Sequence, residues 1–424
     1  MTSRRMFKCF ALFCLILALP VAAQAQTSRV EGMAIQGDYI KDYTGMYTYT
    51  SSVNNVGNLV YGELGINTVA GPLDRAVGAV IGDLWEGKYG TWAIHMREFT
   101  PQLGQGDVTS SPSPGAFGGD PNSNTNESFD LMWGRKFGTT SLGLRLNRSY
   151  ARSESDVGIA APGPLLLSDI KWDFEQGLGT DPNFARNILG FGGGLGFEMS
   201  PTTNFELSVL YQSRTYTTRT ETGGTLEDGG PATYQLAARA FWQWQPNIMV
   251  IPAFKWSSFD LSTKDSTGTT NDNSLKSWQV GASGDWTLGS NDLFILGATV
   301  AQNKVDQQED ITSSGFANGT ITETFTPQIF AALETHVNNW LTLRFGANKG
   351  AWHSIKTENN SATPAESERI KDSPFNMSLG AGVKVGSLQL DAVLNDNLPQ
   401  NGLYLFSGAV TDPMFSKVTA TYSF

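Results

Sequence analysis

Hydrophobic and polar residues alternate with a period of two along most of this 424-residue chain. In the first regular stretch, Phe129, Leu131 and Trp133 share one face, whereas Asp130 and Lys136 lie on the other. A period of two is that of a β-strand, because successive side chains of a strand point to opposite faces. The stretch is about ten residues long and a very short turn separates it from a second one, so the pattern predicts a β-hairpin.

The same combination of long alternating stretches and short turns recurs as far as the C-terminus. The predicted short turns lie at 138–140, 201–204, 245–247, 289–291, 338–339 and 386–387, and the last strand runs from about Met414 to Phe424. The pattern is weaker before residue 127, where 57–65 is predicted as a strand and 75–85 with 89–98 as a hairpin. Longer polar loops connect successive hairpins.

The number and length of these stretches predict an all-β fold of about 16 antiparallel strands, with 14 as the alternative, at roughly 11 residues per strand. Such strands are about twice as long as those of a soluble β-sandwich. An even number of strands, with short turns at one end and long loops at the other, is typical of bacterial outer-membrane barrels. Aromatic residues next to the short turns, such as Trp133, Trp242 and Trp340, fit the interfacial girdle. We therefore expect a transmembrane up-and-down β-barrel.

The first 25 residues have the pattern of a secretory signal peptide. Arg4, Arg5 and Lys8 precede an apolar stretch from Phe10 to Leu19, and Ala23-Gln24-Ala25 fits a cleavage site. We expect residues 1–25 to be removed, which leaves an N-terminal periplasmic or lumenal segment at 26–56 and the barrel at 57–424. No run of 18 apolar residues follows the signal, so a mature helical membrane protein is excluded.

Cysteine content and charge exclude further classes of function. Both cysteines, Cys9 and Cys14, lie in the predicted signal, so the exported chain would have no thiol for a disulfide, a metal cluster or catalysis. Cleavage would remove three of the 29 basic and none of the 40 acidic residues, which leaves a formal charge of −14. This acidic balance argues against nucleic acid as a partner.

Signals for an enzyme or a cofactor are weak. The chain has three histidines, His95, His336 and His353, and none has a spacing to a carboxylate that the sequence can verify. His336 falls in a predicted short turn, and His353 is predicted at the outer rim of the barrel. The chain has no P-loop, no H-E-x-x-H and no EF-hand spacing. We predict no enzymatic activity and no cofactor or metal site.

The C-terminal strand resembles the terminal strand of bacterial outer-membrane β-barrels. Val418, Ala420, Tyr422 and Phe424 lie on one face, and the chain ends on the aromatic residue. The resemblance implies that Tyr422 and Phe424 form the signal that the barrel-assembly machinery reads, and that the chain resides in the outer membrane of a Gram-negative bacterium. It also implies periplasmic chaperones, outer-membrane lipid and lipopolysaccharide as partners, and leaves a homo-oligomer open.

Two segments are similar to pieces of FadL-type transporters of hydrophobic compounds. One is 29–65, which contains RVEGM, DYIKDYTGMYTY and NLVYGELG, and the other is 388–408, LQLDAVLNDNLPQNGLYLFSG. The first resembles the N-terminal segment that precedes or plugs the barrel in that family. The NPA-type motif of the family is not found near the start of this chain.

The face opposite lipid would carry the function of a barrel. Alternation predicts that this face holds basic and acidic residues whose opposed charges select the solutes that pass through a wet lumen. The predicted pore-lining residues are Lys136, Arg145, Arg214, Arg239, Lys255, Arg344, Lys384, Asp130, Glu198, Glu206, Asp285, Glu334 and Asp391. Each of them could instead pair with a neighbour and stabilise the wall.

Two long loops could narrow the pore, 99–126 and 152–186. The first is rich in Gly, Pro, Ser and Asn, and is predicted to be a mobile surface loop. The second is too apolar to remain fully in water. It would either fold into the lumen as a constriction or extend a hairpin above the membrane. The constriction candidates are Leu165, Leu166, Leu167, Trp172 and Phe174.

The sequence leads to three hypotheses of function. The main one is a porin-like channel for passive diffusion of small polar solutes. The alternative is a FadL-like transporter of hydrophobic compounds, in which 26–56 plug the barrel and the apolar loop captures the compound. The third is a structural or adhesive barrel with a blocked lumen. The substrate, the pore diameter and the oligomeric state do not follow from the sequence.

Overall fold

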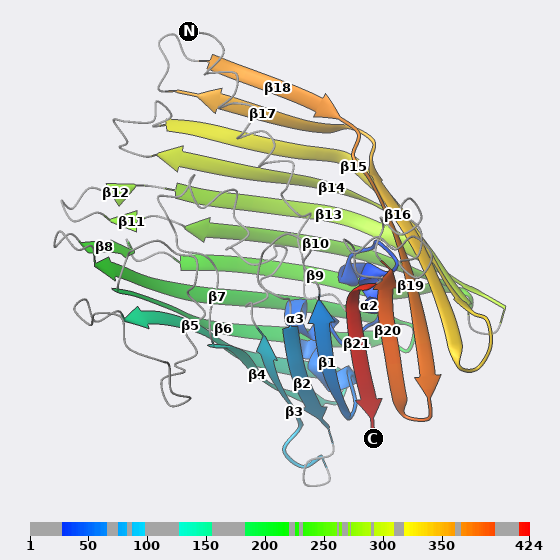
Figure 1. Ribbon diagram of the computed structural model, residues 1–424. Coiled ribbons are helices and arrows are strands. Elements are labelled where there is room, and N and C mark those ends of the chain that lie inside the picture. Colours follow the sequence, from blue (N-terminus) through cyan, green and yellow to red (C-terminus); the bar gives the residue numbers. More distant parts are fainter. Residues whose placement is uncertain are drawn as a thin grey trace, which may run out of the picture.

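One antiparallel sheet closes on itself and forms nearly the whole described molecule (Figure 1). The computed structural model describes residues 28–65, 75–82, 87–97, 127–154, 183–219, 225–228, 232–260, 263–264, 270–271, 273–289, 292–308, 318–360, 366–394 and 415–424. The first half of the sheet comprises β1 (Leu59–Gly65), β2 (Arg75–Ile81), β3 (Thr91–Arg97), β4 (Glu127–Phe137), β5 (Thr140–Glu154), β6 (Asn183–Ser200), β7 (Thr203–Arg219), β8 (Thr225–Asp228), β9 (Ala232–Gln245) and β10 (Ile248–Asp260). The second half comprises β11 (Thr263–Lys264), β12 (Thr270–Asn271), β13 (Asn273–Leu288), β14 (Asp292–Gln308), β15 (Asn318–His336), β16 (Leu341–Gly350), β17 (His353–Asn359), β18 (Glu366–Asp372), β19 (Phe375–Val385), β20 (Leu388–Leu394) and β21 (Phe415–Ser423).

Over the described ranges these segments make 16 barrel strands, as the sequence predicted. Two barrel strands are each interrupted once: β16 continues as β17, and β18 continues as β19, since β15 pairs with both β16 and β17. β8, β11 and β12 are short and extend the wall beyond β7 and β10. β1 and β21 close the ring, with Leu59 opposite Ser423 and Gly65 opposite Lys417.

The predicted alternation separates an apolar outer face from an inner face. Leu144 is 48% exposed and Phe191 55%, whereas the next inward residue after Leu144, Arg145, is 3% exposed. The outer face therefore offers apolar side chains around a closed wall in which neighbouring strands satisfy one another's backbone groups. These two properties define a transmembrane β-barrel.

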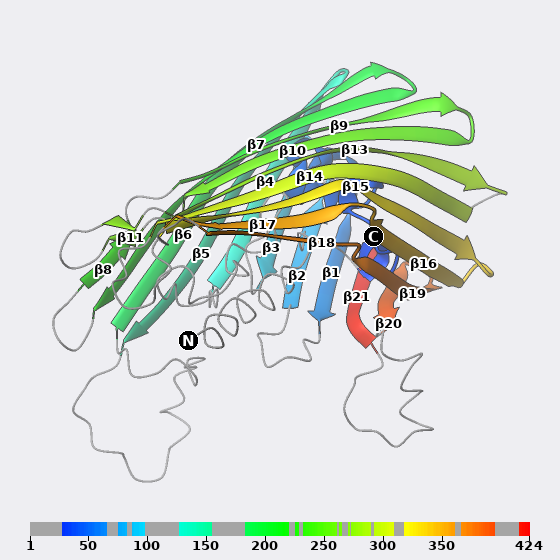
Figure 2. The same cartoon turned by 90° about the horizontal axis from the view of Figure 1, so that it is seen from above.

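Four short helices lie inside the ring of strands rather than on its surface (Figures 1 and 2). They are α2 (Ser28–Glu31), η1 (Gly37–Tyr39), α3 (Gly45–Thr48) and η2 (Thr50–Asn55). Residues 28–58, hereafter the plug, connect them and lead directly into β1. None of the helices in the described part of the chain is long and apolar enough to cross a membrane.

Four predicted boundaries need correction. Residues 152–154 belong to β5 and 183–186 to β6, so the expected loop at 152–186 is shorter than predicted, because the two strands continue to pair beyond the apolar belt. β2 ends at Ile81 rather than at 85, and β3 begins at Thr91 rather than at 89. The expected loop at 99–126 and the constriction candidates Leu165, Leu166, Leu167, Trp172 and Phe174 lie outside the described residues.

The exposed belt makes a direct prediction of stability. Leu144→Arg places a charge on the lipid-facing side of β5 and should lower the free energy of unfolding by about 2 to 4 kcal/mol. Val337→Arg is the matched control, because Val337 is 55% exposed in a short turn at the edge of the barrel. It should cost about 0 to 1 kcal/mol. Denaturant titration of protein folded into lipid vesicles measures both values, and equal costs would contradict the assigned faces.

Candidate functional site: the occupied lumen

The plug fills the lumen with apolar side chains that pack against the inner wall. Met33, Tyr39 and Ile40 form one cluster with wall residues that include Ile251 and Phe330. The rings of Tyr39 and Phe330 lie 4.8 Å apart. A second cluster joins the plug to the first strands of the barrel; it contains Met46, Tyr47, Val53, Leu59, Tyr61, Ala76, Val80, Ala93 and Met132. Residues 28–58 are therefore packed as a core, although they have no long helix or strand.

A network of ion pairs fixes the start of the plug to β15, β16 and β20. Arg29 donates from Nε and Nη2 to the two carboxylate oxygens of Glu334, at 2.9 and 2.8 Å. Arg344 donates from Nε to Glu334 at 2.6 Å and from Nη1 to Asp391 at 2.6 Å. Burial lowers the pKa of Arg29, but the bond to Glu334 outweighs that effect and raises it well above its ordinary value. Arg29 is therefore a permanent cation held by a bidentate contact.

Two further contacts hold the same end of the plug against β21. Lys417 Nζ lies 2.8 Å from Glu31 Oε1. The backbone N–H of Ser28 donates to Thr419 Oγ1 at 3.1 Å, and the two hydroxyls lie 2.7 Å apart. β21 thus pairs with β1 to close the barrel, and its inward side chains Lys417 and Thr419 hold the plug.

The middle of the plug is fixed by a second charged group on β7, β9 and β10. Lys255 Nζ lies 2.6 Å from Asp38 Oδ2, and Tyr49 donates to Asp38 Oδ1 at 3.0 Å. Burial, together with Asp38, holds the pKa of Tyr49 well above its ordinary value, so its hydroxyl stays protonated and can donate. Arg239 donates to Glu206 at 2.6 Å and to the carbonyl of Gly37 at 3.2 Å, and its guanidinium lies 4.0 Å from the ring centre of Tyr49.

A third group, on β1, β3, β4 and β5, holds the plug at Tyr47, on another side of its middle part. Arg145 donates to Asp130 at 2.7 Å and to the carbonyl of Tyr47 at 2.7 Å. The hydroxyl of Tyr47 contacts that of Tyr61, which lies 2.8 Å from Nδ1 of His95. Buried backbone carbonyls need a hydrogen-bond donor. The wall residues Arg145 and Arg239 supply donors to the carbonyls of Tyr47 and Gly37 in the plug.

Glycines on the inner wall leave room for the plug backbone. A Cβ at Gly346 would overlap the carbonyl of Met33, and one at Gly143 would overlap the carbonyl of Thr50. A Cβ at Gly194 would lie 2.6 Å from the backbone N of Ser51. The wall is thus shaped for this segment, and larger residues at these inward positions would displace it.

Most of the predicted pore-lining residues lie on the inner side but make pairs instead of facing open water. Buried inner residues are Arg145, Arg239, Lys255, Arg344, Asp130, Glu206, Asp285, Glu334 and Asp391. Lys136 and Glu198 are exposed beside the short turns, 3.8 Å apart. Lys384 is exposed and lines a cavity at the same end. The side chain of Arg214 lies outside the described residues.

Several inner residues were missed by the sequence interpretation. Arg29 and Asp38 lie in the plug, which shows no alternation. Glu63 and Lys417 lie on strands whose period of two could have placed them inward. His353, predicted at the outer rim, is buried there: it is 5% exposed, with Nε2 2.9 Å from Glu323 Oε1. It is the first residue of β17, directly after the interruption that separates β17 from β16. The alternation along the sequence does not show this interruption.

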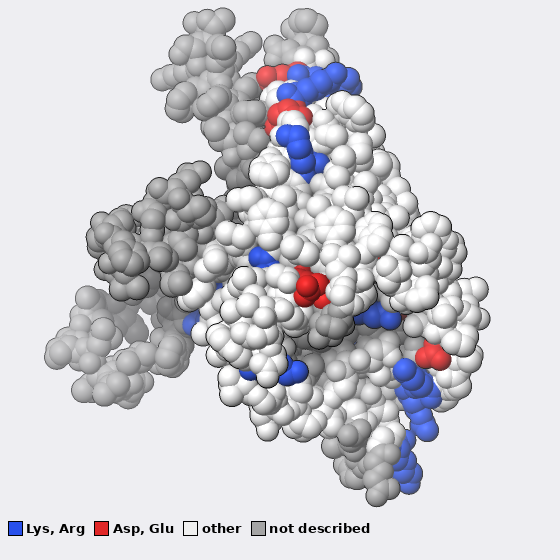
Figure 3. All heavy atoms as spheres, turned by 90° about the vertical axis from the view of Figure 1, so that its right-hand side faces the viewer, with Lys and Arg blue, Asp and Glu red and all other residues white. Residues whose placement is uncertain are grey.

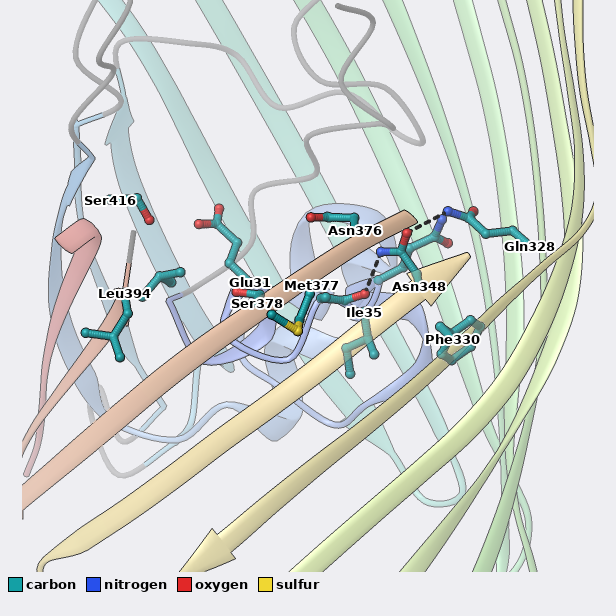
Figure 4. A pocket seen from close by; sticks show the side chains of 13 residues that line it. Glu31, Ile35, Gln328, Phe330, Asn348, Asn376, Met377, Ser378, Leu394 and Ser416 are labelled. Carbon is teal, nitrogen blue, oxygen red and sulfur yellow. Dashed lines mark hydrogen bonds between the residues drawn. The ribbon is translucent and has the colours of Figure 1, made fainter. Parts of the chain in front are cut away.

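Two cavities lie on opposite sides of the first turn of the plug. The cavity farther from the short turns, hereafter the outer cavity, has a volume of 360 Å³ and is lined by Glu31 and 34–36 of the plug and by residues of β15, β16, β19, β20 and β21 (Figure 4). The second, 860 Å³, is lined by Arg29 and Asp42 of the plug and by the short turn at 338–340. Figure 3 shows a hollow on the right-hand side of Figure 1, with acidic and basic side chains in and around it. The start of the plug therefore separates the two spaces.

The described residues form a closed antiparallel β-barrel with an apolar outer belt, and residues 28–58 occupy its lumen. The open, wet lumen expected of a porin is not found in the described part of the chain, because residues 28–58 fill it. No protein-family model matches the chain, and no curated protein matches it.

Among solved structures, the chain is similar to the copper transporter OprC, with 10% identity and a TM-score of 0.42 over 80% of this chain and 61% of OprC. The Ralstonia pickettii toluene transporter TbuX has 10% identity and a TM-score of 0.36, over 93% of this chain and 96% of TbuX. The CymD monoaromatic hydrocarbon channel has 9% identity and a TM-score of 0.38, over 95% and 99%. Similarity at this level assigns neither a family nor a residue role.

Proposed function

We propose that this chain is an outer-membrane transporter of small hydrophobic compounds, closed at rest by its plug. The observation that carries the proposal is the packing of residues 28–58 against the inner wall, with three charged groups holding them. A passive porin needs a continuous water-filled passage through the lumen. Here the plug occupies the lumen, and most of the buried charged residues of the wall pair with the plug or with one another instead of facing water. The transported compound must therefore move part of the plug or pass beside it.

The position of the two cavities indicates which part of the plug forms the barrier. Glu31, Ala34 and Ile35 line the outer cavity, while Arg29 and Asp42 line the cavity at the short-turn end. A shift of residues 28–36 alone would join the two spaces. The rest of the plug could keep its contacts with Arg239 and Arg145 during transport.

The side chains of the outer cavity support a hydrophobic compound. Ile35 and Phe330 contribute apolar surface to it (Figure 4), and so does Val393. Its charged lining residue, Glu31, is paired with Lys417 at 2.8 Å. Small-molecule sites combine apolar surface with placed polar groups, and here Gln328, Asn348 and Asn376 supply the polar part.

Single-channel recording in planar bilayers tests the proposal. The purified full-length protein should show no large steady conductance steps, because the plug blocks the lumen. In detergent solution, it should bind a small hydrophobic compound in a saturable manner. Large steady steps in the absence of any added compound would instead establish the porin hypothesis.

Assembly through the C-terminal strand yields a separate prediction. Tyr422 and Phe424 are 51% and 60% exposed, and their rings lie 6.3 Å apart. Deletion of Phe424 removes one backbone hydrogen bond, to the carbonyl of Asn58 at 3.3 Å, and the proposed signal for the barrel-assembly machinery. The three charged groups that hold the plug stay intact. We expect a loss of several-fold or more in the heat-modifiable protein of the outer membrane, measured by fractionation and immunoblotting. Ser423→Ala should assemble normally. If the Phe424 deletion assembles in normal amounts and Ser423→Ala does not, the proposed role of the aromatic terminus is wrong.

A further inference from the structure

The outer cavity has one polar side and one apolar side, which constrains what it can bind. Its wall comes from β15, β16, β19, β20 and β21, and its remaining side is the plug segment 31–36 (Figure 4). Its apolar side includes the inward side chains of Ile35, Phe330 and Val393. A volume of 360 Å³ lies in the lower part of the range for small-molecule sites.

Amide side chains form the polar side, and two of them are held in place. Asn348 Nδ2 donates to the carbonyl of Ala34 at 3.0 Å, and Gln328 Nε2 donates to Asn348 Oδ1 at 3.3 Å. These bonds orient both amides and connect the wall to the plug. Asn376 also lines the cavity and points into it (Figure 4). An amide offers both a donor and an acceptor, so it recognises a neutral hydroxyl in either role.

The charges around the cavity are already compensated. Glu31 is the ionisable residue of the lining, and its carboxylate lies 2.8 Å from Lys417 Nζ. An anionic ligand would enter beside this carboxylate without a free cation, and burial of an unpaired charge is costly. A wholly apolar ligand would offer no hydrogen bond to Asn376, which lines the cavity beside the two bonded amides.

We propose that the outer cavity binds a small, neutral compound that combines an apolar part with one hydrogen-bonding group, such as an alcohol or a phenol. The inference rests on the proposed function and specifies its substrate class. The apolar part lies against Ile35, Phe330 and Val393, and the polar group faces the amides of Gln328 and Asn376. Because residues 31–36 form one side of the cavity, the bound compound contacts the barrier that it must pass.

Binding of three matched compounds tests the substrate class. p-Cresol, toluene and 4-methylbenzoate share one ring and one methyl group and differ in a hydroxyl, a hydrogen or a carboxylate. Isothermal titration of the full-length protein in detergent should give p-cresol about 3- to 10-fold higher affinity than toluene, the ratio that one neutral hydrogen bond supplies. It should bind 4-methylbenzoate at least about tenfold more weakly than p-cresol. Equal affinity for all three, or preference for the carboxylate, overturns the proposal.

Two variants locate the binding to this cavity. Ser378→Trp adds an indole to its wall and should weaken p-cresol binding at least about tenfold. Thr421→Trp adds the same group to the cavity at the short-turn end and should leave p-cresol affinity unchanged. Asn376→Leu should remove the preference for p-cresol over toluene while it retains toluene binding. The opposite pattern for the two tryptophan variants refutes the location.

The outcomes separate this inference from the function on which it rests. A silent barrel that binds toluene and p-cresol equally keeps the transporter but overturns the substrate class. A silent barrel whose p-cresol binding is unaffected by Ser378→Trp keeps the transporter but overturns the site. Large steady conductance of the wild-type protein contradicts the transporter itself.

Discussion

Replacement of Arg29 by methionine is expected to convert a silent barrel into one that conducts ions. Arg29 makes the bidentate contact that joins the start of the plug to Glu334. Glu334 keeps its bond to Arg344 in the variant, so the wall does not gain an unpaired charge. The plug loses its strongest link to β15, and residues 28–36 should leave the path between the two cavities more often.

The size of the effect follows from the environment of the pair. Loss of one partner of a fully buried ion pair costs about 3 to 5 kcal/mol. Here the side chain of Arg29 is 24% exposed and Glu334 retains Arg344, so we expect about 1 to 2 kcal/mol. This corresponds to a roughly 5- to 30-fold increase in the open population.

Single-channel recording of Arg29→Met beside a matched control measures this increase. Lys384→Met removes a cation from the same cavity, but Lys384 is exposed and forms no ion pair within the described residues. It should remain silent, while Arg29→Met shows frequent openings. If the two variants conduct equally, the ion pair with Glu334 does not hold the plug closed.

The barrel could be predicted from the sequence because its signal is local and repeated. Lipid requires apolar side chains on one face of every strand, so the period of two appears in β4 to β21 without knowledge of any partner strand. Hairpin turns also predict some pairs: a turn centred near Asn339 places Glu334 opposite Arg344, as observed. Glu206 and Arg239 also lie opposite each other, but a long connection separates their strands, so no turn could predict that pair.

The plug could be anticipated only through a resemblance, and its contacts could not be anticipated. Residues 28–58 bury Asp38, Thr50 and Ser51 as well as apolar side chains, so they have neither the period of a strand nor that of a helix. In the sequence, the residues at inward positions of the strands are mostly polar or small. Whether a small residue faces water or a packed backbone depends on contacts between segments hundreds of residues apart, such as Met33 with Gly346.

That dependence changes what substitutions on the inner face should do. From alternation alone, a large residue at Gly143 or Ser208 is expected to be tolerated, since both face the lumen. In the structure, Gly143 lies against the backbone of Thr50, and Ser208 Oγ accepts the backbone N–H of Thr50 at 2.8 Å. Inward positions that contact the plug are therefore as restricted as a protein core.

Gly346→Ala provides the clearest test, because the plug and the barrel should respond in opposite directions. The added methyl group would overlap the carbonyl of Met33, and overpacking of this kind costs about 1 to 3 kcal/mol. Displacement of residues 28–36 relieves the overlap, so the open population should increase roughly 5- to 150-fold. In the strand itself, alanine is favoured over glycine by about 0.5 to 1 kcal/mol, so the barrel should not be destabilised.

Gly62→Ala is the matched control, because a Cβ at Gly62 in β1 meets no atom within 4 Å. It should stabilise the barrel in the same way and leave it silent. Conductance in planar bilayers reports the plug, and denaturant titration of vesicle-inserted protein reports the barrel. If Gly346→Ala is silent and as stable as Gly62→Ala, Met33 does not lie against β16 in the membrane, and the proposed barrier is wrong. If Gly346→Ala conducts while its barrel unfolds no earlier than the wild type, the barrier lies at the start of the plug.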